Sequence, residues 1–277
     1  MSKSKNFLFW VLAFLITAAS AIYQRMTGPT YPISSKIKIE NIFINYKFDR
    51  SHSTSKDYVL KIVTADSTMH GNLFWKRYKF DSEFNKVEMT GTDTLTAALP
   101  KQPPAGKLEY YVVLTKKDKN YSLPSDESVI IRFKDDVPIW VLIPHVLAMF
   151  LSMLFAARAA FEYFSNEPGL KFYTYWTVGI LFVGGFILGP IMQKYAFGEF
   201  WTGFPFGYDL TDNKTLIAMI GWLVALFMLK KSPHPKRWIL FAALLMFLVY
   251  LIPHSVLGSE HDYGKEQLNK EQKYEHE

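Results

Sequence analysis

The chain has 277 residues, of which 49% are hydrophobic and 20% are charged, and its net charge is +6. It contains no cysteine, which excludes disulfides, thiolate zinc sites, iron–sulfur clusters and cysteine nucleophiles. A mean hydropathy of +0.04 is high for a soluble domain and low for a protein made only of membrane helices, so we expect a hybrid of the two.

The first element in chain order is an apolar run over residues 7–23, which follows Lys3 and Lys5. A run of this kind can cross the bilayer as a helix. Ala19-Ser20-Ala21 also has the small-x-small pattern of a signal-peptide cleavage site. Residues 1–24 are therefore either a retained signal-anchor or a removable signal peptide. We expect a retained anchor, and in both cases the chain that follows is exported.

Residues 36–135 have the texture of a β-domain. Seven or eight short segments rich in β-branched and aromatic residues alternate with turn formers such as His70-Gly71 and Pro103-Pro104-Ala105-Gly106. This spacing predicts an all-β sandwich. The stretch Leu99–Leu114 resembles part of fibronectin type III and immunoglobulin-like modules. The resemblance implies their two-sheet fold and, as in most such modules, partner binding or spacing rather than catalysis.

Four further apolar runs cover residues 138–163, 172–191, 215–229 and 238–257, and they predict a four-helix transmembrane domain over 138–257. The run 215–229 is too short for a full span, so its helix should begin earlier, near Leu210. Asp209 would then be the N-cap and Asp212 would lie in the first turn, where carboxylates favour the helix dipole.

Positive charge predicts the orientation. Cytoplasmic loops of membrane proteins are enriched in Lys and Arg. Such residues occur before the first apolar run and in two of the later links, at Lys3, Lys5, Lys171, Lys230, Lys231, Lys236 and Arg237. We therefore expect a multi-pass protein of a bacterial-type inner (plasma) membrane with a cytoplasmic N-terminus. The sandwich, the outer loop 192–214 and the charged tail 258–277 would be extracytoplasmic.

Two histidines are the first candidates for a site. His145 and His254 each end a Leu-Ile-Pro-His tetrapeptide, and the predicted topology places both toward the outer leaflet. An ionisable residue inside a membrane helix suggests a function, and the preceding proline frees a backbone carbonyl nearby. Met149 lies one turn after His145, and the three residues together suit haem, copper or a quinone. Ordinary helix packing is the alternative interpretation.

The outer loop 192–214 holds the next candidates. It is rich in Phe, Trp and Tyr, which suit the membrane interface, so we interpret it as a re-entrant or surface-lying cap. Asp209, Asp212 and Glu260, with His145 and His254, are candidate metal ligands beneath the sandwich. For the two aspartates, the helix-capping role is the alternative. In the helix before the loop, Gly185 and Gly189 have the GxxxG spacing that predicts close helix packing.

Two functional hypotheses follow from these features. The first is an outer-leaflet site that binds a metal, haem or quinone and is associated with redox chemistry. The alternative is a non-enzymatic accessory or assembly subunit, whose sandwich binds an extracytoplasmic protein or a larger membrane complex. The sequence has no nucleotide-binding glycine loop, no HExxH and no GxSxG, so it assigns no enzymatic reaction. We expect the lipid bilayer as a partner and no nucleic acid.

Overall fold

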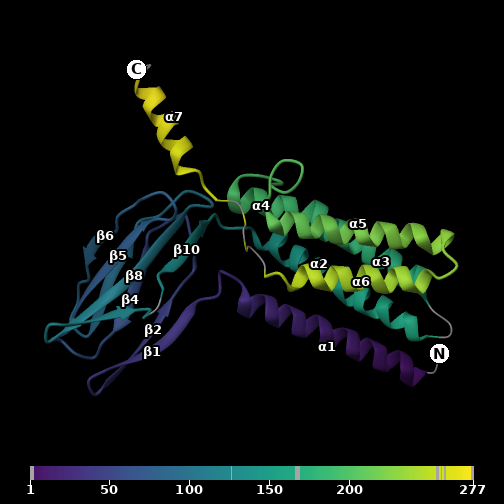
Figure 1. Ribbon diagram of the computed structural model, residues 1–277, viewed down its shortest axis with the longest axis horizontal. Helices are drawn as coiled ribbons and strands as arrows, with labels where there is room; N and C mark the ends of the chain where they lie inside the picture. Colours follow the sequence, from purple (N-terminus) through teal and green to yellow (C-terminus); the bar gives the residue numbers. More distant parts are fainter. Residues whose placement is uncertain are drawn as a thin grey trace. The chain divides into compact units, whose positions relative to one another are not determined.

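The computed structural model describes residues 3–125, 127–165, 169–253, 256, 258 and 260–275. It consists of two compact units, a helical one and a β-rich one, which are both visible in Figure 1. The helical unit combines Met1–Pro29 with Val137–Ser259. The β unit combines Thr30–Asp136 with the C-terminal segment Glu260–Glu277.

The helical unit is a bundle of long apolar helices. It contains α1 (Lys3–Thr27), α2 (Ile139–Phe161) with a 3-10 turn η1 (Glu162–Phe164), α3 (Leu170–Phe182), a π-helical segment η2 (Val183–Leu188), α4 (Gly189–Phe197), α5 (Leu210–Lys231) and α6 (Pro235–Leu251). Within the described residues, four segments are long and apolar enough to cross a membrane: Lys3–Thr27, Ile139–Phe164, Leu170–Phe197 and Leu210–Lys231. Small residues such as Ala156, Ala218 and Ala242 are fully buried between helices, where they let the backbones approach closely.

The helix boundaries confirm one prediction and correct two. As predicted, α5 begins at Leu210, and the side chain of Asp209 accepts a hydrogen bond from the Thr211 N–H. The run 172–191 continues as helix to Phe197, where Gly198 adopts the left-handed conformation that ends it, so the loop covers 198–209 rather than 192–214. The helix of the last run ends at Leu251, because Pro253 forces the preceding residue out of the helical conformation.

Helix α1 is joined to the bundle by polar contacts near both of its ends. Near its start, Asn6 Oδ1 accepts a hydrogen bond from Arg158 of α2 at 2.7 Å. Near its end, Gln24 Nε2 donates to the backbone oxygen of Tyr250 on α6 at 2.5 Å. Between them, the ring of Phe9 stacks on Phe161 with 5.3 Å between centroids. Interhelical hydrogen bonds of this kind hold membrane helices together.

The described part of the β unit contains three separate sheets. Strands β1 (Ile33–Ile39) and β2 (Ile42–Phe48) form an antiparallel hairpin, and β4 (Tyr58–Val63) pairs with β7 (Thr94–Leu99). The largest sheet has the order β3-β10-β8-β5-β6, and β9 also pairs with β8. Its strands are β3 (Ser51–Ser53), β5 (His70–Arg77), β6 (Asn85–Glu88), β8 (Lys107–Lys116), β9 (Lys119–Leu123) and β10 (Val129–Lys134).

One hydrophobic core joins the three sheets. Alternate residues of β2, β4 and β8 are buried, as expected for strands with one face on a core and the other exposed. Phe48, Leu60, Tyr110 and Phe133, which come from strands of all three sheets, are almost completely inaccessible and belong to a single cluster. The segments rich in β-branched and aromatic residues that predicted the strands thus supply this core.

Two short strands were not predicted from the sequence, and the C-terminal segment is helical. Strands β8 and β9 form a hairpin whose two turn residues, Lys117 and Asp118, both have positive φ. The short β3 was also missed; it pairs in parallel with β10. The charged tail contains helix α7 (Tyr263–Glu275), and residues at and just before its start pack on the β unit.

Candidate functional site

In the helical unit, His145 is fixed by the π-helical segment. Its Nδ1 lies 2.9 Å from the backbone oxygen of Gly184, which also accepts the N–H of Gly189. A carbonyl oxygen can only accept, so Nδ1 carries the proton and, in the neutral ring, Nε2 keeps its lone pair. Met149 lies on the same side of η2, since a Cβ built on Gly184 would be 3.1 Å from its sulfur. The structure therefore brings together two of the three predicted cofactor residues.

The predicted metal ligands do not form a cluster within the described part of the chain. Asp209 is the N-cap of α5, and Asp212 accepts hydrogen bonds from the N–H groups of Thr202 and Gly203. Glu260 belongs to the β unit, and His254 lies outside the described residues. Among the residues that the structure describes, no three His, Asp or Glu side chains come together as a metal site requires. The metal prediction thus has no support from the described side chains.

A buried lysine near Asp209 was missed by the sequence reasoning. Lys214 of α5 is only 2% exposed, and its Nζ donates to the backbone oxygen of Ile252 at 2.9 Å. Its ammonium group also lies 5.8 Å from the ring centroid of Tyr250. The carbonyl groups at the end of a helix lack hydrogen-bond partners within the helix. Lys214 supplies a hydrogen bond to the carbonyl oxygen of Ile252, the residue that follows α6. The local sequence around Lys214 has no pattern that would have indicated this contact.

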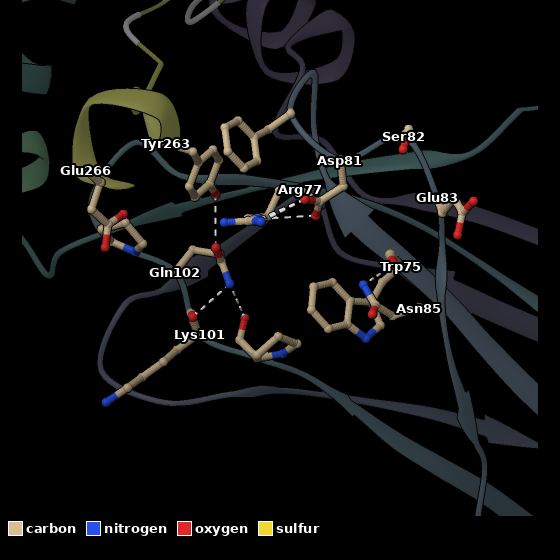
Figure 2. Close-up of a pocket in the computed structure, with 13 residues that line it drawn as sticks. Trp75, Arg77, Asp81, Ser82, Glu83, Asn85, Lys101, Gln102, Tyr263 and Glu266 are labelled. Atoms are coloured by element: carbon tan, nitrogen blue, oxygen red, sulfur yellow. Dashed lines mark hydrogen bonds and ion pairs between the residues drawn. The ribbon is translucent and has the colours of Figure 1, made fainter. Parts of the chain in front are cut away.

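The β unit contains an open groove of about 800 Å³, shown in Figure 2. Its walls come from the ends of β5 and β7, the start of β6 and the C-terminal segment. Residues that line it include Trp75, Arg77, Asp81, Asn85, Lys101, Gln102 and Tyr263. In Figure 2, Tyr263 lies on one side, Trp75 and Asn85 lie on the other, and Arg77 and Gln102 lie between them.

An ion pair forms the centre of the groove. The Arg77 guanidinium donates to both carboxylate oxygens of Asp81, with Nη2 2.7 Å from Oδ1. It lies 4.3 Å from the ring centroid of Phe80 and 5.4 Å from that of Tyr263. These hydrogen bonds hold the pKa of Asp81 below its usual range. The pair offers a donor and an acceptor side by side, while its own charges cancel.

The C-terminal segment forms one wall of the groove. Glu260 forms ion pairs with Lys107 at 2.7 Å and with Lys79 at 3.1 Å. The backbone N–H of His261 donates a hydrogen bond to the backbone oxygen of Ala105. The Tyr263 hydroxyl donates to Gln102 Oε1 at 3.0 Å. Burial raises the pKa of Tyr263 to about 12, so the hydroxyl stays protonated and can donate. The groove therefore has its full shape only when this segment is docked.

Docking of the C-terminal segment is expected to depend on pH through Glu260. Burial alone would raise the pKa of this carboxyl, but Lys107 and Lys79 outweigh it and hold the pKa below 4.5. A lowered carboxyl pKa contributes stability at neutral pH that is lost as the pH falls below about 4.5. Hydrogen exchange over residues 260–268 should be several-fold faster in Glu260→Gln than in wild type at pH 7. The two proteins should become alike near pH 3, and a difference that persists there would contradict the assignment.

Comparison with known proteins adds no assignment: no family model matches this sequence, and no curated protein matches it.

Proposed function

We propose that the protein is a non-enzymatic accessory protein of a bacterial-type inner membrane, whose extracytoplasmic β unit binds an extended segment of a partner polypeptide. The groove carries this proposal. It is open, it is flanked by the aromatic side chains of Trp75 and Tyr263, and its central ion pair is internally neutralised. A groove of this kind suits a peptide backbone, which presents donors and acceptors in alternation, better than a small, strongly charged substrate.

The edge of the main sheet supports the same partner class. Strand β6 (Asn85–Glu88) is the last strand of its sheet and starts at the groove. In the described residues it pairs only with β5, so one side of its backbone is open to another strand. Extended peptides commonly bind by adding a strand to such an edge, while pockets beside it select their side chains.

The path of the chain supports a topology with the β unit and the C-terminal segment on one side of the membrane. The chain leaves the β unit at Asp136 and rejoins it at Glu260. It must then cross the membrane an even number of times in between. Three candidate spans lie in that interval, so α6 should be the fourth crossing. Its 17 residues reach about 25 Å at 1.5 Å per residue, near the lower limit for a span.

The fold and orientation in this proposal rest on further observations. The single core shared by three sheets supports the immunoglobulin- or fibronectin III-like sandwich. The Lys and Arg residues in the first turn of α1, the last turn of α5 and the first turn of α6 support a cytoplasmic N-terminus. The contacts of Asn6 and Gln24 with α2 and α6 support retention of α1 as an anchor, because a cleaved signal peptide would leave their partners exposed.

Site-specific photocrosslinking in native membranes tests the partner. A photoreactive residue at Ser82, at the rim of the groove, should give one discrete, protease-sensitive adduct. The control is the same residue at Asn45, which is exposed on β2 and does not line the groove. Combining the Ser82 probe with Arg77→Ala should remove the adduct. Equal products from both positions, or only free protein from both, would refute the proposal.

A second candidate function is a cofactor site at His145, in line with the predicted haem, copper or quinone. The observation that favours it is the fixed tautomer: metal-ligating histidines usually donate their other N–H to a backbone carbonyl or carboxylate. π-helical segments like η2 also occur often at functional sites. The gently purified protein should then show a haem spectrum, bound copper or extractable quinone, all lost in His145→Ala. A colourless preparation free of metal and quinone would eliminate this candidate.

A further inference from the structure

The loop 198–209 connects two candidate membrane spans. It follows α4, which ends the span Leu170–Phe197, and it precedes α5, which begins the span Leu210–Lys231. A loop of twelve residues between two spans lies at the boundary of the bilayer by chain continuity alone. Whether it extends into water or into lipid depends on its backbone and its exposed side chains.

The backbone of this loop is hydrogen-bonded within the protein. Asp212 Oδ2 accepts the N–H groups of Thr202 at 2.7 Å and Gly203 at 3.0 Å, and Asn213 Oδ1 accepts that of Phe204 at 2.7 Å. The N–H groups of Phe206, Gly207 and Asp209 donate to loop carbonyls. The N–H groups of residues 202–204, 206, 207 and 209 are thus paired within the protein. A loop surrounded by water does not need this pairing, whereas a loop in lipid does, because no water is present to replace missing hydrogen bonds.

The packing of the loop holds this arrangement in place. A Cβ on Gly203 would come within 2.6 Å of Asp212 Cβ, so the loop backbone lies directly against the first turn of α5. Trp201 donates its Nε1 hydrogen to the Phe204 oxygen at 3.0 Å, and its ring stacks on Phe186 of η2. The loop is therefore a preorganised structure attached to two membrane helices.

This preorganised backbone displays aromatic side chains outward. Phe206 is 81% exposed and Tyr208 is 94% exposed, and Phe200 and Phe204 are also exposed. Holding large apolar groups in water costs about 25 cal/mol per Å² of apolar surface. Aromatic residues are enriched where membrane proteins meet the headgroup region, because one part of each ring is apolar and another can remain polar.

We propose that residues 202–209 form a lipid-immersed aromatic segment of this loop, with Phe204, Phe206 and Tyr208 inserted at the boundary between headgroups and acyl chains of the outer leaflet. The internally paired backbone permits the immersion, and the exposed rings supply its driving force. Lipid is the occupant favoured here because the loop joins two spans directly. Asp212 and Asn213 are positioning residues that keep the loop in its inserted shape. The inference is independent of the groove in the β unit.

The absence of native cysteine makes a direct test possible in the full-length chain. Nitroxide labels at Phe206→Cys and, separately, at Tyr208→Cys would be studied in lipid nanodiscs by their collision rates with oxygen, which concentrates in lipid, and with a polar nickel complex, which stays in water. Ile220→Cys, on an exposed residue in the middle of α5, is the lipid control. His234→Cys, in the exposed link before α6, is the aqueous control.

Both loop labels should show an oxygen-to-nickel collision ratio several-fold above that of the label at position 234 and closer to that of the label at 220. Ratios equal to the aqueous control would overturn the proposal. Labels protected from both reagents in native membranes, and exposed to both in nanodiscs of the purified protein, would also overturn it and would assign the loop to a protein partner instead.

Discussion

Replacing Arg158 by Ala is expected to lower the free energy of unfolding of the helical unit by about 3–5 kcal/mol. Arg158 and Glu162 are each 1% exposed and form an ion pair one helical turn apart at the end of α2. The guanidinium also donates to Asn6 and lies 4.4 Å from the ring centroid of Tyr173. The loss is large because alanine leaves Glu162 as a buried carboxylate without its main partner.

Two further variants separate the ion pair from simple packing. Arg158→Lys keeps the charge but loses the fork that contacts both Glu162 and Asn6, so its stability should be intermediate. The double variant Arg158→Met with Glu162→Leu removes both charges and should recover most of the loss. Unfolding in detergent, followed by circular dichroism, measures all three. An Arg158→Ala protein as stable as wild type would show that this pair contributes little.

Replacing Tyr110 by Ala is expected to destabilise the β unit by about 3–5 kcal/mol, the cost of removing a buried aromatic side chain. Tyr110 is inaccessible to solvent, and its ring contacts Phe48 at 5.6 Å between centroids. Its hydroxyl donates to the Asp49 backbone oxygen at 2.9 Å. Phe48 and Tyr110 come from different sheets, so the substitution tests whether the sheets depend on a shared core.

The matched control for this prediction is Tyr110→Phe, which keeps the ring and removes only the hydroxyl group. It should cost about 1 kcal/mol. Hydrogen exchange of the amides in β2 and β8 reports the opening of the β unit within the full chain. In Tyr110→Ala, both strands should exchange faster by a similar factor. Acceleration confined to β8 would contradict a core shared between the sheets.

Hydropathy and local patterns predicted much of this fold. Apolar run length located the four candidate spans, and the short run 215–229 correctly placed the helix start at Leu210 with Asp209 as its cap. Short segments rich in β-branched and aromatic residues, separated by turn formers, located most of the strands. The end of the last helix at Leu251 was not predicted, because the apolar composition continues past Pro253. Pro253 was nevertheless a local signal for this end, since a proline disfavours the helical conformation of the residue before it.

The contacts that define the candidate sites could not be predicted in this way. Arg158 pairs with Asn6 and Glu260 pairs with Lys107, and the residues of each pair are more than 150 positions apart. Local periodicity contains no information about such pairs. The groove likewise has its full shape only when Tyr263, from the C-terminal segment, docks against β8 at Lys107. The acidic residues around Asp212 suggested a metal site, whereas the described structure uses its carboxylate to bind backbone N–H groups.

The account depends most directly on the β unit and the C-terminal segment sharing one side of the membrane. Single-cysteine variants at Asn45, Leu268 and His234 would be treated with a membrane-impermeant maleimide in intact spheroplasts and again after permeabilisation. All three positions are exposed in the structure. We predict that positions 45 and 268 react in intact cells and that 234 reacts only after permeabilisation. Protection of position 268 in cells where position 45 reacts would mean an odd number of crossings, and it would contradict the account.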